Sequence, residues 1–595
     1  MHEHRRAVPK GEFRNAQHGG FLMTPSQIIV LATPVFLLMI AGEYLLSVSR
    51  GRQVYRLSDA INSISLGVLS QLGGLFTKLL AIGIYSAVYY SVAPWPDLPF
   101  WSTWYGALLA LVFYDFCYYW LHRAGHEVGV FWAAHVVHHQ SQQYNLSTAL
   151  RQTSSGALLG WVFYLPMAVA GVPPLIFGIV ALVDLLYQFW VHTELVGKLG
   201  WFDRVFCAPS NHRVHHAIND RYLDRNYGGI LILWDRLFGS YCEEREPCVY
   251  GTRGALRSWD PLWANTEVYW GLLLASWRTR SWADKLRLWL KPPGWQPPDV
   301  AQRWPKPAFV LREVTVFDPP LSKPRACFAA TQFLLLLGGV SMVLWFAGSW
   351  PTSRTAIVSV ALLAFYWAVG AVLQGRISIM AALLVDCAAL ATATSALGLT
   401  DAHYLFKPLA MVLALAVVIE RGRANEFTPR HALLLGAALM ASLVGDVFLM
   451  LPGNWFIPGL AAFLVAHLFY LALFRQGQTW FPSRPALALC LGFGALMFAG
   501  LWSGLGDAGL KSAVAIYVVA IGLMAAQAVG RAANLGDASA GAVAAGAVIF
   551  MASDSLIAIN RFVSTIPYAP LWILATYYTA QLLMVMNMRA SPQRH

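Results

Sequence analysis

Apolar runs of about 20 residues recur along this sequence, and each is long enough to cross a bilayer as a helix. The first half of the 595-residue chain holds runs at 28–46, 61–92 and 105–121, and a hairpin at 158–191 broken at Val172, Pro173 and Pro174. Ten more runs follow, at about 327–348, 355–374, 378–398, 405–420, 431–451, 456–475, 485–503, 511–529, 541–559 and 569–588. The pattern predicts an all-α, polytopic integral membrane protein.

Composition supports this class and argues against others. The chain is 57% hydrophobic and only 12% charged, which is not the balance of a soluble protein. Its net charge of +12 comes from basic residues in short loops, which positive loops flanking membrane spans explain better than a nucleic-acid surface. The seven cysteines are scattered without a CxxC pair, so neither a disulfide framework nor a thiolate metal site is indicated.

The amino-terminal 1–26 segment is polar and basic, with Arg5, Arg6, Lys10 and Arg14. The apolar run that follows lacks a small-residue cleavage site, so we expect a retained helix rather than a signal peptide. The loop at 49–56 carries Arg50, Arg52 and Arg56, which the positive-inside rule places in the cytoplasm. If 61–92 crosses once, the basic tail lies outside, against the same rule, so one loop is misassigned or 61–92 crosses twice.

Nine of the sixteen histidines fall within the 95 residues from 122 to 216. Because residues at i, i+3 and i+4 share a helix face, each cluster can direct two or three imidazoles at one point. Neutral imidazole is a ligand for iron, zinc, copper and nickel, and nine ligands suit two ions better than one. The predicted metal ligands are His122, His126, His135, His138, His139, His192, His212, His215 and His216.

The absence of two known metal-binding motifs from the sequence indicates which reaction the predicted metal site performs. There is no zincin HExxH motif, and no paired Glu-x-x-His set of the kind that binds two irons in soluble four-helix proteins. An all-histidine, carboxylate-poor centre beside membrane helices favours oxygen activation over hydrolysis. A purely structural zinc site is the alternative.

The segments DFCYYWLHRAGHE, HVVHH, HTE, PSNHRVHH and NYGGILILWDRLFGSYCEE resemble the fatty acid hydroxylase and sterol desaturase superfamily of membrane di-iron enzymes that use dioxygen. The run from HTELVGKLGWFDRVFCAPSNHRVHHA through NYGGILILWDRLFG, with the later SWADKLRLWLKPPGW, is most similar to the alkylglycerol monooxygenase family. The resemblance covers about 30–300. It implies two iron ions, O2, and a tetrahydrobiopterin electron donor for hydroxylation of the ether-linked carbon of glyceryl ethers.

Two carboxylates stand near the histidine motifs. Asp115 precedes His122 by seven residues, and Glu194 follows His192. Each is a candidate for supporting a metal ligand or lining a cofactor pocket, and each could equally be a structural hydrogen-bonding partner.

Between 197 and about 326 no membrane span is predicted. Trp263, Trp270 and Trp277 recur every seven residues, and Trp282 and Trp289 follow among four basic residues. Tryptophan beside cations suits a helix lying in the headgroup layer, and a packed tryptophan-rich cap over the metal site is the alternative. Nine prolines between Pro292 and Pro324 then indicate a linker, which we place at 301–326.

Ionisable residues inside the later apolar runs are site candidates, because such groups are costly in a membrane. These are Lys407, Asp446, His467, Asp554 and Arg561, with Asp386 and Glu420 nearer the ends of their runs. Structural ion pairs, such as Asp554 with Arg561, are the alternative.

The segments KPLAMVLAL, SLVGDVFLMLPGN, FLVAHLFYLALF, SDSLIAINRF and ATYYTAQLL resemble the YhhN-type lysoplasmalogenases. The resemblance covers about 378–590 and implies a membrane hydrolase of about eight helices that cleaves the vinyl ether of lysoplasmalogens. Vinyl ether hydrolysis needs a proton donor and a group that steadies the cation or activates water, as glycoside hydrolysis does. We predict Asp446 and Asp554 as catalytic, supported by Lys407, His467, Asn560 and Arg561.

Together these readings predict a hydroxylase domain at 27–300 with a cytoplasmic cap, a linker, extra spans at 327–374 and a lysoplasmalogenase-like domain at 378–590. The expected function is degradation of ether lipids in two reactions, with glyceryl ethers and lysoplasmalogens as membrane substrates and an electron donor as partner. The alternative is a sterol or fatty acid desaturase or hydroxylase with a transporter or scaffold as its second domain. We expect an integral membrane protein, in the inner membrane if the source is bacterial, with the metal site facing the cytoplasm.

Overall fold

The computed structural model describes residues 23–96 and 98–589, so most of the predicted tail at 1–26, including its four basic residues, lies outside it. Helices are the main regular secondary structure of the described residues, which otherwise contain loops and two isolated β-bridges, Phe206–Leu231 and Ala217–Tyr250. Twelve of these helices are long and apolar enough to cross a membrane. The predicted all-α, polytopic membrane fold is therefore confirmed.

The first helices settle the ambiguous run at 61–92. After α1 (Pro25–Ser49), α2 (Leu57–Val92) is one continuous helix, in which Leu57–Thr77 is long and apolar enough for a span and Leu80–Val92 is a shorter apolar stretch. The run at 105–121 lies in α3 (Trp104–Glu127), which is not among the twelve candidate spans. Aromatic and polar residues, Asp115 among them, make α3 less apolar than the spans around it.

The predicted hairpin at 158–191 is wrong in its first arm. That arm is broken into α6 (Gly156–Leu159), the 3-10 helix η2 (Gly160–Tyr164) and α7 (Leu165–Val169), each too short to cross. The break before α8 (Pro174–Trp190) is where the two prolines predicted it. The other short helices of this half are η1 (Pro99–Ser102), α4 (Gly129–His139), α5 (Leu146–Ala149), α9 (Phe202–Val205), α10 (Pro209–His216) and α11 (Leu233–Phe238).

Ten long helices follow, one for each predicted apolar run. Polar N-cap residues mark where several begin, since the side chains of Ser378, Thr428, Ser483, Asp507 and Asp537 each accept a hydrogen bond from a backbone N–H in the first turn. The helices are α15 (Lys323–Phe346), α16 (Thr352–Leu373), α17 (Ile379–Ala396), α18 (Thr400–Arg423), α19 (Pro429–Met450), α20 (Phe456–Phe474), α21 (Arg484–Leu501), α22 (Ala508–Leu535), α23 (Ala538–Phe562) and α24 (Ala569–Asn587).

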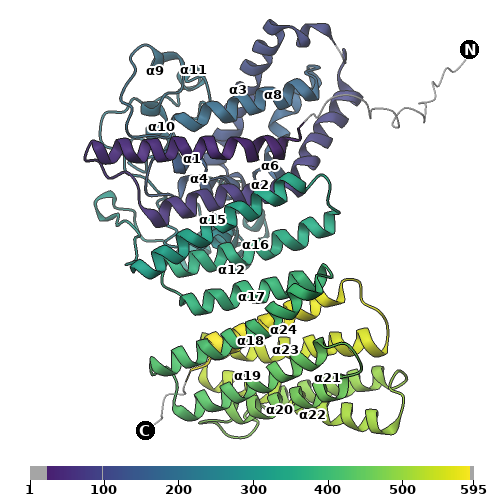
Figure 1. The fold of residues 1–595 in the computed structure, drawn as a ribbon. Helices are drawn as coiled ribbons and strands as arrows, with labels where there is room; N and C mark the ends of the chain where they lie inside the picture. Colours follow the sequence, from purple (N-terminus) through teal and green to yellow (C-terminus); the bar gives the residue numbers. More distant parts are fainter. Residues whose placement is uncertain (1–22, 97, 590–595) are drawn as a thin grey trace, which may run out of the picture.

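The helices α15 and α16, which correspond to the extra spans at 327–374, lie between the amino-terminal half and the bundle formed by α17–α24 (Figure 1). On one side, Phe333 of α15 belongs to an apolar cluster with Ile61 of α2. On the other, Val372 of α16 packs in a cluster with Val385 of α17. The pair therefore joins the two parts through hydrophobic contacts on both of its faces.

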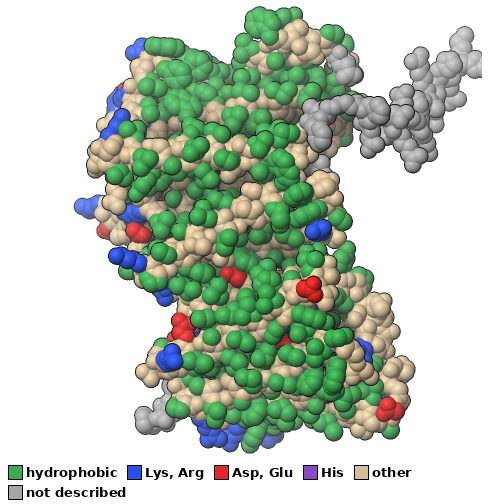
Figure 2. Space-filling model, viewed as in Figure 1, with side chains coloured by type: hydrophobic (Ala, Val, Ile, Leu, Met, Phe, Trp, Pro, Cys, Tyr) green, Lys and Arg blue, Asp and Glu red, His purple; other side chains and the backbone are tan. Residues whose placement is uncertain are grey.

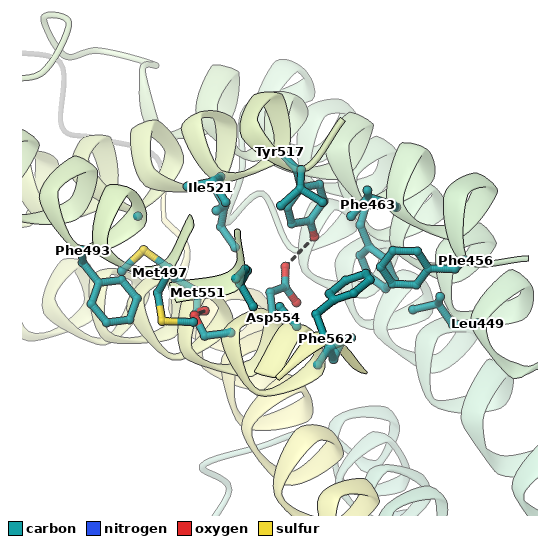
Figure 3. Close-up of a pocket in the computed structure, with 18 residues that line it drawn as sticks. Leu449, Phe456, Phe463, Phe493, Met497, Tyr517, Ile521, Met551, Asp554 and Phe562 are labelled. Carbon is teal, nitrogen blue, oxygen red and sulfur yellow. Dashed lines mark hydrogen bonds between the residues drawn. The ribbon is translucent and has the colours of Figure 1, made fainter. Parts of the chain in front are cut away.

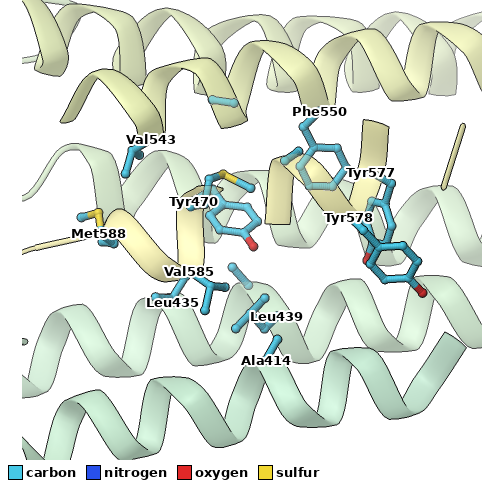
Figure 4. Packing of buried hydrophobic residues seen from close by; sticks show 14 of the residues in the cluster. Ala414, Leu435, Leu439, Tyr470, Val543, Phe550, Tyr577, Tyr578, Val585 and Met588 are labelled. Carbon is cyan, nitrogen blue, oxygen red and sulfur yellow. The ribbon is translucent and has the colours of Figure 1, made fainter. Parts of the chain in front are cut away.

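The bundle α17–α24 has its own apolar core, in which Leu439 of α19, Tyr470 of α20, Phe550 of α23 and Tyr577 of α24 pack together (Figure 4). Small residues such as Ala414 on α18 let these helices approach closely. Hydrophobic side chains also cover most of the visible outer face of the molecule, with Lys and Arg gathered mainly at its margins (Figure 2). An exterior of this kind suits lipid contact.

The tryptophan-rich segment forms α12 (Pro261–Arg278) and α13 (Trp282–Leu290). Trp277 is 85% exposed and Trp282 is 81% exposed, which argues against a packed cap at these two positions and favours contact with headgroups. On its other face α13 buries Leu288 close to Gly129 at the start of α4.

The predicted linker at 301–326 contains the end of α14 (Pro298–Arg303), the 3-10 turn η3 (Leu311–Glu313) and the start of α15. It lies against the amino-terminal half, because the backbone N–H of Phe317 donates to Gln142 and Asp318 lies 3.5 Å from Arg56.

Candidate metal centre and candidate hydrolytic site

The nine predicted metal ligands come from four separate places in the amino-terminal half. The last turns of α3 carry His122 and His126, and α4 carries His135, His138 and His139. His192 follows the end of α8, and α10 carries His212, His215 and His216. The i, i+3 and i+4 spacings place the imidazoles of each helix on one face, as expected.

The structure divides these histidines into two neighbouring groups. Within each group, one ring nitrogen from every residue lies within 4.8 Å of those of the other members. The first group is His122, His126, His135, His139 and His215, and the second is His138, His192, His212 and His216. The two groups touch, since the rings of His139 and His216 stack with centroids 4.3 Å apart.

Backbone carbonyls fix the orientation of four of the rings. The Nδ1 atoms of His122, His138, His192 and His215 lie 2.8–3.0 Å from the carbonyl oxygens of Tyr227, Arg151, Gln188 and Arg225. A carbonyl oxygen can only accept, so each Nδ1 carries the hydrogen and leaves the Nε2 lone pair free. This is the arrangement that orients a histidine as a metal ligand.

The contacts between the free nitrogens show that the donor set fits metal ions. The Nε2 atoms of His138 and His192 lie 3.2 Å apart although both rings already use their hydrogen at Nδ1. Two lone pairs then face each other, which is unfavourable unless a cation lies between them. In the first group, the Nε2 atoms of His122, His126 and His215 are buried without a hydrogen-bond partner among the described residues.

Burial also sets the protonation state. Desolvation lowers the pKa of His138 to about 4 and holds the pKa values of His139 and His212 well below the usual histidine range. These imidazoles are neutral at pH 7, which is the form that binds a metal ion.

Neither predicted supporting carboxylate belongs to a histidine group. Asp115 accepts hydrogen bonds from the backbone N–H groups of Ile230 and Leu231, at 2.7 and 3.0 Å, and from Nε1 of Trp234 at 2.8 Å. It therefore holds the turn before α11. The backbone oxygen of Glu194 accepts from Arg52, which ties the His192 segment to the basic loop after α1.

Sequence reasoning missed Glu43, a buried carboxylate inside the apolar run of α1. It accepts hydrogen bonds from Tyr55, from Thr193 beside His192, and from the backbone N–H of Leu146 at 2.7 Å. The contacts join α1 to the segment that carries His192. The rule applied to charges in the later spans would have found Glu43, because it is also an ionisable residue in an apolar run.

In the bundle α17–α24 the two predicted catalytic aspartates have different partners. Asp446 on α19 lies 3.3 Å from Nζ of Lys407 on α18 and accepts a hydrogen bond of 2.6 Å from Tyr577 on α24. Asp554 on α23 lies 3.2 Å from Nε2 of His467 on α20 and accepts a hydrogen bond from Tyr517 on α22. Each carboxylate therefore draws partners from two other helices.

Asp554 lines an apolar cavity between the helices, and Asp446 is not among the residues that line it. This cavity has about 760 Å³ of empty space and is lined almost entirely by apolar residues, including Phe456, Phe493 and Met551 (Figure 3). Its polar lining residues are Asp554, Tyr517 and Ser555. An apolar cavity with a few convergent polar groups is the usual form of a site for a ligand with a hydrocarbon chain.

The remaining two predicted supporting residues lie elsewhere. The guanidinium of Arg561 stacks over the ring of Phe456 at 4.2 Å and lies 3.5 Å from Asn454. The side chain of Asn560 accepts a hydrogen bond from the backbone of Ile566. Asp554 pairs with His467, so the alternative of an Asp554–Arg561 ion pair is wrong.

Comparison with known proteins finds two families in the two parts of the chain. The fatty acid hydroxylase family model matches residues 107–240, and the YhhN family model matches residues 402–588. Alkylglycerol monooxygenase from Homo sapiens is 37% identical over 313 residues, covering 51% of this chain and 68% of that protein. Lysoplasmalogenase TMEM86B from Homo sapiens is 34% identical over 185 residues, covering 31% of this chain and 76% of that protein. Lysoplasmalogenase TMEM86B from Sus scrofa is 35% identical over 182 residues, covering 31% of this chain and 74% of that protein. No solved structure matches the chain.

Proposed function

The chain belongs to the alkylglycerol monooxygenase family through its amino-terminal half and to the YhhN lysoplasmalogenase family through its carboxy-terminal bundle, and we propose that it degrades ether lipids at two separate sites. The first site, in a domain at 27–300, hydroxylates and cleaves alkylglycerol ethers. The second, in a domain at 378–590, hydrolyses the vinyl ether of lysoplasmalogens. Both reactions release a fatty aldehyde from the same position of a glycerolipid.

The oxygenase proposal rests on the two converging histidine groups. The first group would hold one iron ion and the second another, and such a centre supplies the redox chemistry that activates dioxygen. The chain keeps the imidazoles neutral by burial and directs their lone pairs inward through the carbonyls of residues such as Tyr227 and Gln188. In the overall reaction, the ether, O2 and a tetrahydropterin give a hemiacetal, water and a dihydropterin. The hemiacetal then collapses to aldehyde and alcohol.

The basic loop between α1 and α2 supports a cytoplasmic position for this site. Arg50 and Arg52 donate hydrogen bonds to the backbone oxygens of Leu195 and Glu194, just after His192. The positive-inside rule places this loop, and with it the site, on the cytoplasmic side of the membrane.

A direct experiment is to incubate the purified protein with alkylglycerol under O2, with and without tetrahydrobiopterin, and to measure iron content and aldehyde together. We expect about two irons per chain and aldehyde formation only when both O2 and the pterin are present. Hydroxylation of a sterol or fatty acyl chain in place of the ether would reject the alkylglycerol assignment. Purified protein that contains zinc and consumes no oxygen would contradict the oxygenase function.

The hydrolase proposal rests on the position of Asp554 at the edge of an apolar cavity. The cavity would hold the hydrocarbon chain with its vinyl ether near Asp554 and Tyr517. A proton is added to the vinyl carbon, water attacks the resulting oxocarbenium carbon, and the hemiacetal separates into fatty aldehyde and the glycerol alcohol.

The different partners suggest different roles for the aspartates. Asp554, with His467 and Tyr517, forms the group that delivers the proton, because it alone of the two lines the cavity. Asp446, which lies 3.3 Å from Lys407, would then be the group that stabilises the developing cation or activates the water.

Replacing Asp554 or Asp446 by asparagine tests this assignment. Each variant should lose at least about 100-fold in aldehyde release from lysoplasmalogen, the scale expected on removal of an acid–base group. Asp386→Asn is the matched control, because Asp386 is also a buried carboxylate of the bundle but pairs with Gln332 of α15. Unchanged hydrolysis in both catalytic variants would favour a transporter or scaffold role for this domain.

A further inference from the structure

The apolar cavity of the bundle has two different ends. At one end, the lining residues lie where helices begin or finish: Phe456 is the first residue of α20, Leu501 the last of α21 and Phe562 the last of α23. Because consecutive helices of the bundle run in opposite directions, these helix ends lie on one face of the bundle. At the other end, Phe493 and Met551 belong to the interior of their helices. The cavity therefore runs from one face of the bundle towards its middle.

The inner end of this cavity suits the hydrocarbon chain of a lipid. Phe493, Met497 and Met551 line it, on the other side of Asp554 from Phe456 (Figure 3). Phe493 is also 40% exposed, so a chain longer than the cavity can continue past it into the surrounding lipid. A lipid bound in this way would have its polar part at the helix ends, on the side of Phe456.

Arg561 lies at this polar end. Its guanidinium is 4.2 Å from the centre of the Phe456 ring and 5.8 Å from that of the Phe562 ring, and both rings line the cavity. The side chain is exposed and donates one long hydrogen bond, of 3.5 Å, to Asn454. In the described part of the chain, Arg561 forms no ion pair with a carboxylate. A cation that stacks on aromatic rings and has no carboxylate partner is available to bind an anion.

The spacing between Asp554 and Arg561 fits a glycerophosphate. The two residues are seven positions apart on α23, so they share a helix face and their Cα atoms are offset by about 10 Å along the helix axis. In a 1-alkenyl glycerophospholipid, seven bonds join the vinyl carbon that takes the proton to the phosphorus, and an extended chain of that length spans about 8 Å. The long, flexible side chain of arginine can cover the difference. A vinyl ether held at Asp554 would therefore place its phosphate within reach of Arg561.

We infer that Arg561 binds the phosphate of the lysoplasmalogen head group and selects phosphate-bearing vinyl ethers over phosphate-free alkenylglycerols; the inference rests on the hydrolase function proposed above. A guanidinium can donate two parallel hydrogen bonds to one phosphate, which the hydroxyl of a free glycerol cannot accept in the same way. This contact would separate the substrates of the two domains, because an alkylglycerol carries no phosphate.

Aldehyde release from two substrates with the same alkenyl chain, 1-alkenyl-glycero-3-phosphoethanolamine and 1-alkenylglycerol, tests the inference in the full-length protein. We expect Arg561→Gln to raise the KM for the phospholipid about 10- to 100-fold, the effect of losing hydrogen bonds to a charged group, and to leave kcat/KM for alkenylglycerol unchanged. Arg561→Lys keeps the charge but not the paired donors, so its KM should lie between the two. The matched control is Arg354→Gln on α16, an exposed arginine 4.5 Å over the ring of Trp350, which should behave as the wild type does.

Binding of the saturated analogue 1-alkyl-glycero-3-phosphoethanolamine separates this inference from the hydrolase function, because the analogue has no double bond to protonate. Calorimetric titration under argon, where the oxygenase cannot consume the analogue, should show about 10- to 100-fold weaker binding by Arg561→Gln than by the wild type. Equal binding by the two proteins, no binding by the wild type, or an equal loss of both alkenyl substrates in Arg561→Gln would overturn the phosphate assignment while the hydrolase function stands. Weaker binding by Arg561→Gln in a protein whose wild type releases no aldehyde would uphold the phosphate site and reject the hydrolase function.

Discussion

At the scale of single residues, the candidate metal centre depends on which nitrogen of each imidazole carries the hydrogen. Carbonyl groups hold the Nδ1–H of His138 and His192, so their Nε2 lone pairs face each other at 3.2 Å. The motif spacings predicted these residues as ligands, but not which ring nitrogen would keep a free lone pair. That choice depends on carbonyls from residues outside the motifs, such as Tyr227 for His122.

Removing one histidine ligand should abolish iron binding by its own histidine group and leave iron binding by the other group unchanged. We expect His126→Ala to lower iron content from about two to about one per chain, because His126 belongs only to the first group. The loss of affinity should exceed the roughly 10–100-fold seen when only the partner of a ligand is removed. Metal analysis of purified protein measures the result.

The control for this substitution is His403→Ala, a half-buried histidine of α18 that bonds to the backbone of Ala391. It should keep the full iron content. Retention of two irons by His126→Ala would show that the five-residue group does not bind as a unit.

At the scale of elements, α16 supports the loop before α12. The side-chain oxygen of Gln374, just after α16, accepts from Ser258 at 3.2 Å and from the backbone N–H of Trp259 at 3.4 Å. Gly370 lets the two segments meet, because a Cβ there would lie 2.2 Å from the Trp259 backbone oxygen. The extra pair α15–α16 therefore does more than add spans, since α16 also holds the loop before α12 in place.

Gly370→Ala should destabilise the protein by about 1–3 kcal/mol, the usual cost of forcing a methyl group into a packed contact. The melting temperature in detergent should therefore fall. Gly338→Ala on α15 is the matched control, because nothing lies within 4 Å of its added Cβ. Equal melting temperatures for the two variants would mean that the loop before α12 can move away from α16 with little loss of stability.

At the scale of the whole molecule, the two candidate sites share no residue or helix. The histidine groups lie on α3, α4, α10 and the segment after α8, whereas both aspartates and their partners lie on α18–α24. The chain is thus two catalytic units joined by the α15–α16 pair.

Metal removal should separate the two reactions. After treatment with an iron chelator, aldehyde release from alkylglycerol should fall to background, while release from lysoplasmalogen should stay within about twofold of its starting rate. Adding Fe²⁺ back should restore the first reaction. Both substrates can be followed in one sample by mass spectrometry of their distinct aldehydes, and a parallel loss of both would contradict independent sites.

The sequence alone determined the helical membrane class, because the length of an apolar run is a local property that the bilayer thickness fixes. It also predicted that the nine histidines come together, since their spacing places those of each segment on a common helix face, and the structure brings all nine into two neighbouring groups. The first arm of the 158–191 run was mispredicted because its hydropathy does not reveal how it breaks into short helices. Only the tertiary structure decided that the histidines divide five to four, that Asp554 pairs with His467 and Tyr517 rather than Arg561, and that the backbone of Trp259 packs against Gly370 of α16. These facts depend on contacts between helices far apart in the chain, and residue spacing along one segment carries no information about them.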